Sequence, residues 1–147
     1  IKDISFDKLI KVLTINTIGP TLVGKYFIPY LRKDSKSTFA FLSARVGSIS
    51  DNKLGGWYSY RASKTALNQI IRNFSIEVAR SNKNAIFIGL QPGTVKSFLI
   101  KPFEKNVKSE NIFTPEFSAK KMLEVIEKLD SSDSGKVFAW DGEEINP

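Results

Sequence analysis

The sequence contains neither cysteine nor histidine, and these two absences restrict the chemistry that is open to the chain. Without cysteine there are no disulfides, no thiol nucleophiles and no thiolate metal ligands. Without histidine, the usual general base and the commonest metal ligand are missing as well. Any acid–base catalysis therefore has to use tyrosine, lysine, serine or a carboxylate.

Long apolar runs are missing too. No run approaches the roughly 20 residues that a transmembrane helix needs, and no signal-peptide pattern opens the chain. We therefore expect no membrane association and a cytoplasmic location. The 147 residues are enough for one domain with a substantial core. The chain begins at Ile1 rather than at methionine, which favours the hypothesis that it is a piece of a longer protein.

The net charge is +7, from 22 Lys and Arg residues against 15 Asp and Glu residues. A charge of this sign can indicate a nucleic acid or another polyanion as a partner. The basic residues are spread along the chain among acidic ones, however, and no nucleic-acid-binding motif accompanies them. We expect a solvated basic surface and no nucleic-acid partner, and we keep a basic polyanion-binding domain as an alternative.

Hydrophobic periodicity predicts helices that alternate with short apolar strands. The expected helices cover residues 5 to about 30, about 57 to 80, and 114 to 129. The expected strands cover residues 38–42, 85–90 and 135–140. A polar loop is expected at 44–56, and an irregular connection at 94–110.

This alternation predicts an open α/β sheet of about three parallel strands with covering helices. Ligands of such sheets bind beyond the carboxyl ends of the strands, which here means near Ser43 and Pro92. On the third helix the expected core-facing stripe consists of Ala119, Met122, Leu123, Ile126 and Leu129.

Tyr60 and Lys64 lie one turn apart on the second helix and share one stripe with Leu67, Ile71, Phe74 and Val78. Burying an ammonium is costly unless something compensates, although a lysine can also snorkel from a helix end. An ammonium one turn from a phenol favours the phenolate and is expected to lower the pKa of Tyr60. Tyr60 can then give a proton to a carbonyl oxygen or take one from an alcohol.

Asn16 falls on the apolar stripe of the first helix, which contains Leu9, Leu13, Val23 and Phe27. A buried Asn needs hydrogen-bond partners, which a site or local bonding can supply. Pro20 has no amide hydrogen to donate to the carbonyl of Asn16. We therefore expect a free carbonyl at Asn16 and a kink in the helix there.

Several segments around these residues resemble the short-chain dehydrogenases/reductases. Residues 56–64 (GWYSYRASK) resemble the family's YxASK signature, and Asn16 in 15–19 (INTIG) resembles its catalytic Asn. Residues 41–47 (FLSARVG) resemble the strand and loop that carry its Ser, and 91–97 (QPGTVKS) resemble its Pro-Gly segment. The resemblance runs from about residue 5 to the end. Residues 43–64 are most similar to the carbonyl-reductase-like and C-factor-like branches.

The resemblance implies a Rossmann-type, doubly wound parallel sheet in which residues 1–147 form the carboxy-terminal, catalytic part of one domain. It implies an NAD(P)-dependent oxidoreductase that passes a hydride between nicotinamide and a small carbonyl or alcohol substrate. Tyr60 would move the proton, Lys64 would lower its pKa and hold the ribose, and the Asn16 carbonyl would hold a water linked to Lys64. The cofactor-binding residues that it implies are Tyr60, Lys64, Pro92, Gly93, Thr94, Val95 and Ser97. A homodimer or homotetramer through the helices that contain Asn16 and Tyr60 is implied as well.

The sequence departs from the family pattern in two places. The family's catalytic Ser stands three residues before the glycine that corresponds to Gly47, and that position is Ala44. Ser43 or Ser48 would have to replace it, and Ser43 is our candidate. The glycine-rich strand–TGxxxGxG–helix segment and the residue that separates NAD from NADP are absent. We therefore expect NAD or NADP, and we keep a non-catalytic binding or interaction module derived from the family as an alternative.

Overall fold

The main sheet of the protein, in this computed structural model, consists of three parallel strands. The structure describes residues 1–2, 4–98, 100–101 and 111–147. The strands are β1 (Ser37–Leu42), β2 (Ala85–Gln91) and β5 (Val137–Ala139), in the order β1–β2–β5. Ser37 pairs with Ala85, and Gly89 pairs with Val137. The predicted α/β class and the three parallel strands are confirmed.

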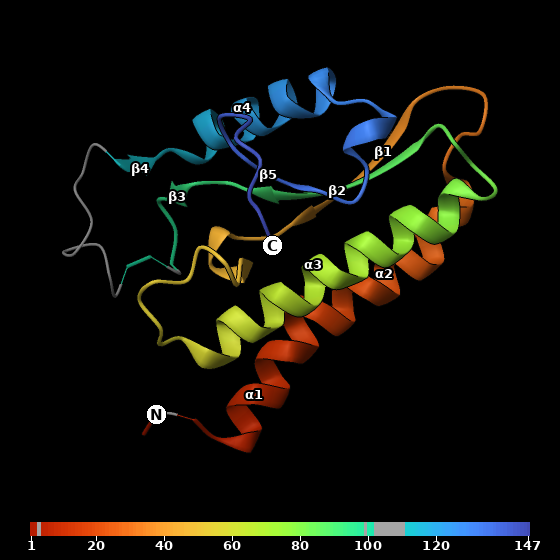
Figure 1. The fold of residues 1–147 in the computed structure, drawn as a ribbon. Helices are drawn as coiled ribbons and strands as arrows, with labels where there is room; N and C mark the ends of the chain where they lie inside the picture. Colours follow the sequence, from red (N-terminus) through yellow and green to blue (C-terminus); the bar gives the residue numbers. More distant parts are fainter. Residues whose placement is uncertain (3, 99, 102–110) are drawn as a thin grey trace.

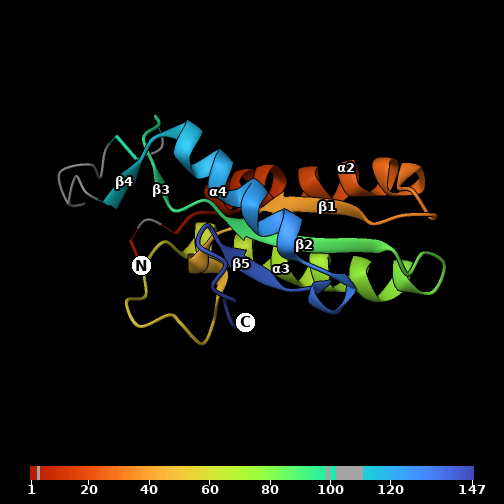
Figure 2. The same cartoon turned by 90° about the horizontal axis from the view of Figure 1, so that it is seen from above.

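Helices cover both faces of this sheet, as Figures 1 and 2 show. On one face lies α4 (Pro115–Lys128), and on the other lie α2 (Gly19–Phe27) and α3 (Tyr58–Ala79), with α1 (Phe6–Leu13) packed against α3. Two short strands, β3 (Thr94–Val95) and β4 (Ile112–Phe113), form a separate parallel pair beyond the carboxyl end of β2. The expected irregular connection therefore starts with an ordered strand, while residues 99 and 102–110 of it lie outside the described residues.

Strand β2 supplies side chains to two hydrophobic cores. Ala85 and Phe87 point toward α3 and pack in one core with Phe41, Leu67 and Ile71. The residues of β2 that point to the opposite face, Ile86, Ile88 and Leu90, pack in the other core with Val125 of α4 and Phe138 of β5. Because successive residues of a strand point to opposite faces, a continuous apolar strand can serve both layers.

The first predicted helix is interrupted at the residue where the sequence predicted a disturbance. Between α1 and α2 the chain forms a π turn over Thr14–Ile18, in which the amide of Gly19 donates to the carbonyl of Thr14, five residues back. Pro20 cannot supply the amide that a regular α-helix would place against the Asn16 carbonyl. The helix is therefore irregular around Asn16, in the form of a π turn, and the predicted kink and free carbonyl at Asn16 stay predictions.

The predicted stripe on the third helix is wrong at Ala119 and Leu123. Leu123 is 60% exposed and Ala119 is exposed, whereas Val125 and Ser118 are buried. Ser118 can occupy a core-facing position because its hydroxyl donates to the carbonyl of Pro92 at 2.6 Å. Hydrophobic periodicity could not predict that Ser118 is buried, because serine is polar and its hydrogen-bond partner, Pro92, lies far away in the sequence.

Candidate active site

Tyr60 and Lys64 come together at the carboxyl edge of the sheet. Figure 1 shows the first turns of α3 at the same end of the molecule as the carboxyl ends of β1 and β2. The Nζ atom of Lys64 donates to the carbonyl of Leu42, the last residue of β1, at 2.8 Å. The same Nζ atom lies 6.0 Å from the centroid of the Tyr60 ring. The side chain of Lys64 is turned inward, and the residue is only 9% exposed.

Burial controls the titration of both groups. It lowers the pKa of Lys64 and raises the pKa of Tyr60 from its ordinary value of 10.0. The sequence predicted the opposite direction for Tyr60, on the ground that the neighbouring ammonium favours the phenolate. The cause of the raised pKa is the loss of hydration of the half-buried phenol. Tyr60 is therefore a protonated acid at neutral pH.

Asn16 reaches the Tyr60 turn through Ser63. The Nδ2 atom of Asn16 donates to Ser63 Oγ at 3.0 Å, and Ser63 Oγ donates to the carbonyl of Tyr60 at 2.8 Å. Beside this contact, Thr17 Oγ1 donates to the carbonyl of Ser63 at 2.8 Å. The π turn is thus hydrogen-bonded to α3 at Ser63, which lies between Tyr60 and Lys64 in the sequence.

Ser43 and Ser48 are both buried and both engaged with other partners. The hydroxyl of Ser43 donates to Asn68 Oδ1 at 2.6 Å. The hydroxyl of Ser48 shares a hydrogen bond with Ser50 Oγ at 3.2 Å and accepts the amide of Asp51 at 3.1 Å. Among the described residues, no hydrogen bond joins either serine to Tyr60. The catalytic role of Ser43 stays a prediction.

The loop after Ser43 lies directly against α3. At its 3₁₀ turn, Arg45–Gly47, a Cβ atom on Gly47 would come within 2.9 Å of the Cβ atom of Lys64. Thr65 Oγ1 donates to the Gly47 carbonyl at 2.8 Å and holds the two segments together. The missing side chain of Gly47 therefore allows the loop to approach the helix turn that carries Lys64.

Apart from Tyr60 and Lys64 on α3, the residues predicted to bind the cofactor lie in one segment of the chain after β2. Pro92 and Gly93 make the turn, with Gly93 at a φ of 77°, and Thr94 and Val95 form β3. Ser97 follows and is exposed. This segment leaves the carboxyl end of β2, which is where an open parallel sheet binds its ligands.

Four polar residues that fix these groups were not among the predicted site residues: Thr17, Ser63, Asn68 and Ser118. Each of them is a polar residue on a face that contacts the core, and buried polar groups in native proteins are almost always bonded. For three of them the position in or next to a motif was a usable signal, whereas Ser118 lies outside every motif. Thr17 follows Asn16, Ser63 precedes Lys64, and Asn68 stands one turn after Lys64.

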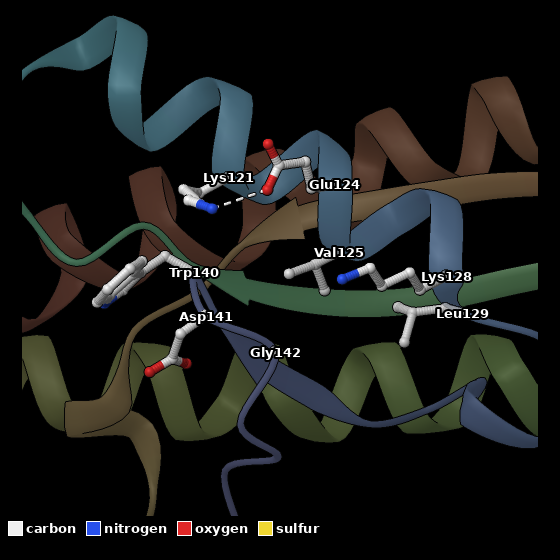
Figure 3. A pocket seen from close by; sticks show the side chains of 8 residues that line it. All are labelled: Lys121, Glu124, Val125, Lys128, Leu129, Trp140, Asp141 and Gly142. Carbon is white, nitrogen blue, oxygen red and sulfur yellow. Dashed lines mark hydrogen bonds and ion pairs between the residues drawn. The ribbon is translucent and has the colours of Figure 1, made fainter.

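A cavity of about 230 Å³ lies elsewhere, between α4 and the turn after β5 (Figure 3). An ion pair between Lys121 and Glu124, 2.9 Å apart, lies on the α4 side of it, and Trp140 and Asp141 lie on the other. None of the predicted site residues lines this cavity. In the part of the chain that the structure describes, no group of three or more His, Cys, Asp or Glu residues is placed to hold a metal ion. No helix among the described residues is long and apolar enough to cross a membrane.

Comparison with known proteins agrees with the resemblance in the motifs. The model of the family "short chain dehydrogenase" matches residues 1–108. This chain belongs to the short-chain dehydrogenase family. It is 31% identical over 143 residues to C-signal of Myxococcus xanthus, covering 97% of this chain and 81% of that protein. It is 32% identical to 1-hydroxy-2-glutathionyl-2-methyl-3-butene dehydrogenase of a Rhodococcus species, covering 95% of this chain and 58% of that protein.

Solved structures of the short-chain dehydrogenase family share the fold. The NADPH-bound carbonyl reductase from chicken fatty liver matches with a TM-score of 0.85 at 27% identity, covering 100% of this chain and 60% of that one. The carbonyl reductase Sniffer of D. melanogaster matches with a TM-score of 0.87 at 24% identity, again covering 60% of that chain. The chain thus spans less than two thirds of these structures. The Rossmann-type fold and the family that the motifs indicated are confirmed.

Proposed function

We propose that the protein containing this chain is an NAD(P)-dependent oxidoreductase that interconverts a small carbonyl compound and its alcohol. The observation that carries the proposal is the pair of Tyr60 and Lys64, with Nζ 6.0 Å from the ring centroid, at the carboxyl edge of a parallel sheet. Membership of the short-chain dehydrogenase family supports it. So does the likeness to a carbonyl reductase that was solved with NADPH bound.

The residues present fit the nicotinamide end of such a cofactor. Pro92, Gly93, Thr94 and Val95 place backbone groups where the sheet ends, and Ser97 offers an exposed hydroxyl beyond them. The phenol of Tyr60 and the ammonium of Lys64 can hold the hydroxyls of a ribose at the same edge. The cofactor, when bound, supplies the hydride, whereas the protein supplies position and the proton.

In the reduction, Tyr60 donates its hydroxyl proton to the carbonyl oxygen while the carbonyl carbon accepts the hydride. The raised pKa of Tyr60 keeps this proton in place at neutral pH. The phenolate that is left lies near the Lys64 ammonium, whose hydrogen bond goes to the uncharged carbonyl of Leu42. The positive charge of Lys64 can therefore stabilise the phenolate until it takes a proton from solvent.

Ser43 remains our candidate for a second donor to the carbonyl oxygen. To fill this role its hydroxyl has to turn away from Asn68 Oδ1, to which it now donates. Ser48 would have to leave Ser50 in the same way. We assign Asn16 a place in the same machinery, because its side chain fixes Ser63 and, through Ser63, the backbone of Tyr60.

We also propose that the protein forms a homodimer or homotetramer through the helices that contain Asn16 and Tyr60. Support comes from large apolar side chains exposed along the first of these helices, namely Ile15, Ile18, Leu22, Val23 and Tyr26. Sedimentation of the whole encoded protein measures the assembly state. A charged residue at Ile18 or Tyr26 is expected to shift it toward the monomer.

A second candidate function is a non-catalytic binding module derived from the family. The observation that favours it is Ala44, which stands where the family has its catalytic Ser, while the nearby serines are bonded to other residues. A module of this kind would keep the fold and the cofactor segment but would lack turnover.

Assays on the whole encoded protein distinguish the oxidoreductase from the non-catalytic binding module. Consumption of NADPH and of NADH is followed with a panel of small aldehydes and ketones, and binding of each cofactor is titrated separately. We expect cofactor-dependent reduction of at least one carbonyl class. Binding without turnover would support the module instead, and a protein that binds neither cofactor would refute the proposal.

A further inference from the structure

Three aromatic side chains close around the turn that follows β2. Phe113 of β4 packs edge-on against Trp140, with ring centroids 4.6 Å apart. Phe117 of α4 lies 4.9 Å from Phe113 and 5.8 Å from Trp140. This aromatic cluster (Phe113, Phe117 and Trp140) brings together three segments of the chain that follow the turn in sequence.

The backbone of Gly93 lies directly beneath the aromatic cluster. A Cβ atom at this position would stand 2.6 Å from the Phe113 ring and 3.1 Å from Trp140. Because the φ of Gly93 is 77°, the turn also uses a backbone conformation that other residues rarely adopt. The conformation of the turn and the position of the two rings are therefore matched to each other.

A second contact holds the residue before Gly93. Ser118, which is 2% exposed, donates its hydroxyl to the Pro92 carbonyl at 2.6 Å. Ser118 stands in the first turn of α4, and Thr114 Oγ1 caps the start of that helix by accepting the amide of Phe117. On the other side of the turn, Val95 pairs with Phe113, and the amide of Lys96 donates to the Phe113 carbonyl at 2.9 Å.

We propose that Ser118 and the aromatic cluster are positioning residues that fix the backbone of Pro92–Val95 for the nicotinamide cofactor. The inference rests on the proposed function, which assigns this segment to the cofactor. Neither Ser118 nor Trp140 belongs to the motifs by which the family was identified. They act on the site through Pro92 and Gly93, and they take no part in the proton transfer.

The expected effect of Ser118→Ala on the turn can be estimated from the hydrogen bond to the Pro92 carbonyl that this change removes. A neutral hydrogen bond that is removed from a buried pair changes an equilibrium by about fivefold. Ser118→Ala should therefore raise the population of open turn, and with it the rate of amide exchange, by about this factor. The Kd for the cofactor should rise in proportion to the loss of the closed fraction, and it approaches the same factor when the open turn predominates without cofactor, because only the closed turn is assigned to binding.

The test uses the whole encoded protein with Ser118→Ala and Trp140→Leu, the conservative variant Trp140→Phe, and Leu123→Ala as a control on the exposed face of α4. Amide exchange of a peptide covering residues 91–96 is measured without cofactor, and the Kd for NADPH and for NADH is measured separately. We expect faster exchange and a higher Kd in the first two variants, with kcat at saturating cofactor retained. Trp140→Phe should restore most of both properties, and Leu123→Ala should match the wild type.

Two results would overturn the inference. One is an unchanged exchange rate at 91–96 in both Ser118→Ala and Trp140→Leu. The other is a loss of amide protection at 91–96 large enough to leave the closed turn in the minority, together with an unchanged Kd, which would make the contacts purely structural. If the wild type binds no cofactor at all, the proposed function fails. The exchange rates then decide by themselves whether the cluster fixes the turn.

Discussion

The ammonium of Lys64 donates to the carbonyl of Leu42 at 2.8 Å, although Lys64 is almost completely buried. Its acceptor is uncharged, so the cost of burying the positive charge is only partly offset. The lowered pKa of Lys64 has the same cause, because burial disfavours the charged form. A buried lysine with this acceptor does not contribute much to the stability of the fold. Its nearness to Tyr60 indicates a role in the chemistry of the phenol.

Tyr60→Phe is expected to lower kcat for carbonyl reduction by about 100-fold or more, since a positioned acid contributes rates of this order. The Kd for the cofactor should rise by no more than about fivefold, because one hydroxyl contact with the ribose is lost while the ring and its packing are kept. Tyr58→Phe is the matched control, since Tyr58 is an exposed tyrosine two residues earlier on the same helix. Steady-state kinetics and cofactor titration measure both quantities. Full activity in Tyr60→Phe would remove Tyr60 as the proton donor.

The pH dependence of the reduction follows from the raised pKa of Tyr60. The acid has to be protonated, so the rate is constant below this pKa and falls as the pH rises through it. We expect no loss of kcat/KM on passing through neutral pH and a fall only in the alkaline range. Lys64→Met removes a charge that favours the phenolate, and it should move this fall to higher pH while lowering the rate.

A fall of kcat/KM near neutral pH in the wild type would contradict this prediction. It would mean that the charge of Lys64 outweighs burial once the cofactor is bound, as the sequence alone indicated. The pH profile of Lys64→Met would then identify the cause, since the fall should move to the alkaline range when the charge is absent.

Ser43→Ala tests the second donor. We expect kcat to fall about tenfold, which is less than a fully dedicated donor costs, because this hydroxyl is shared with Asn68. Ser48→Ala is the control and should retain kcat. Thermal unfolding of both variants separates a loss of stability from a loss of catalysis.

An unchanged kcat in both Ser43→Ala and Ser48→Ala would mean that neither serine replaces the hydroxyl that is missing at Ala44. In that event Ala44→Ser should raise kcat/KM, because it restores a hydroxyl at the position where the family has one. No change in Ala44→Ser as well as in Ser43→Ala would mean that Tyr60 polarises the carbonyl without a second donor.

The face of α3 could be predicted from the sequence, because helical periodicity alone decides that Tyr60, Lys64 and Leu67 share a stripe. The irregularity in the first helix was also predictable, since it follows from the missing amide of Pro20. The partner of Ser43 was not predictable, because it depends on how β1 and α3 pack. The direction of the Tyr60 pKa shift was not predictable either, because burial of a phenol is a property of the fold.

Thr17→Val tests the attachment of the π turn to α3. This change removes the hydroxyl that donates to the Ser63 carbonyl but keeps the shape of the side chain. We expect the free energy of unfolding to fall by about 1 kcal/mol, the usual net value of a hydrogen bond. Thr14→Val, at an exposed position at the start of the same turn, should cost much less. Denaturant titration of the two variants gives the comparison, and equal losses would mean that the Thr17 bond adds nothing.

Strands β1 and β2 pair in parallel, with Ser37 opposite Ala85, and the whole of α3 lies between them in the sequence. Parallel neighbours cannot be closed by a short hairpin, so the ends of this long segment must meet before any strand bond forms. Such non-local contacts slow folding, and we expect the crossover helix to dock together with the strands because it packs against both of them. We therefore expect the apolar stripe of α3 that presents Tyr60 and Lys64 to be also the surface on which β1 and β2 first pair.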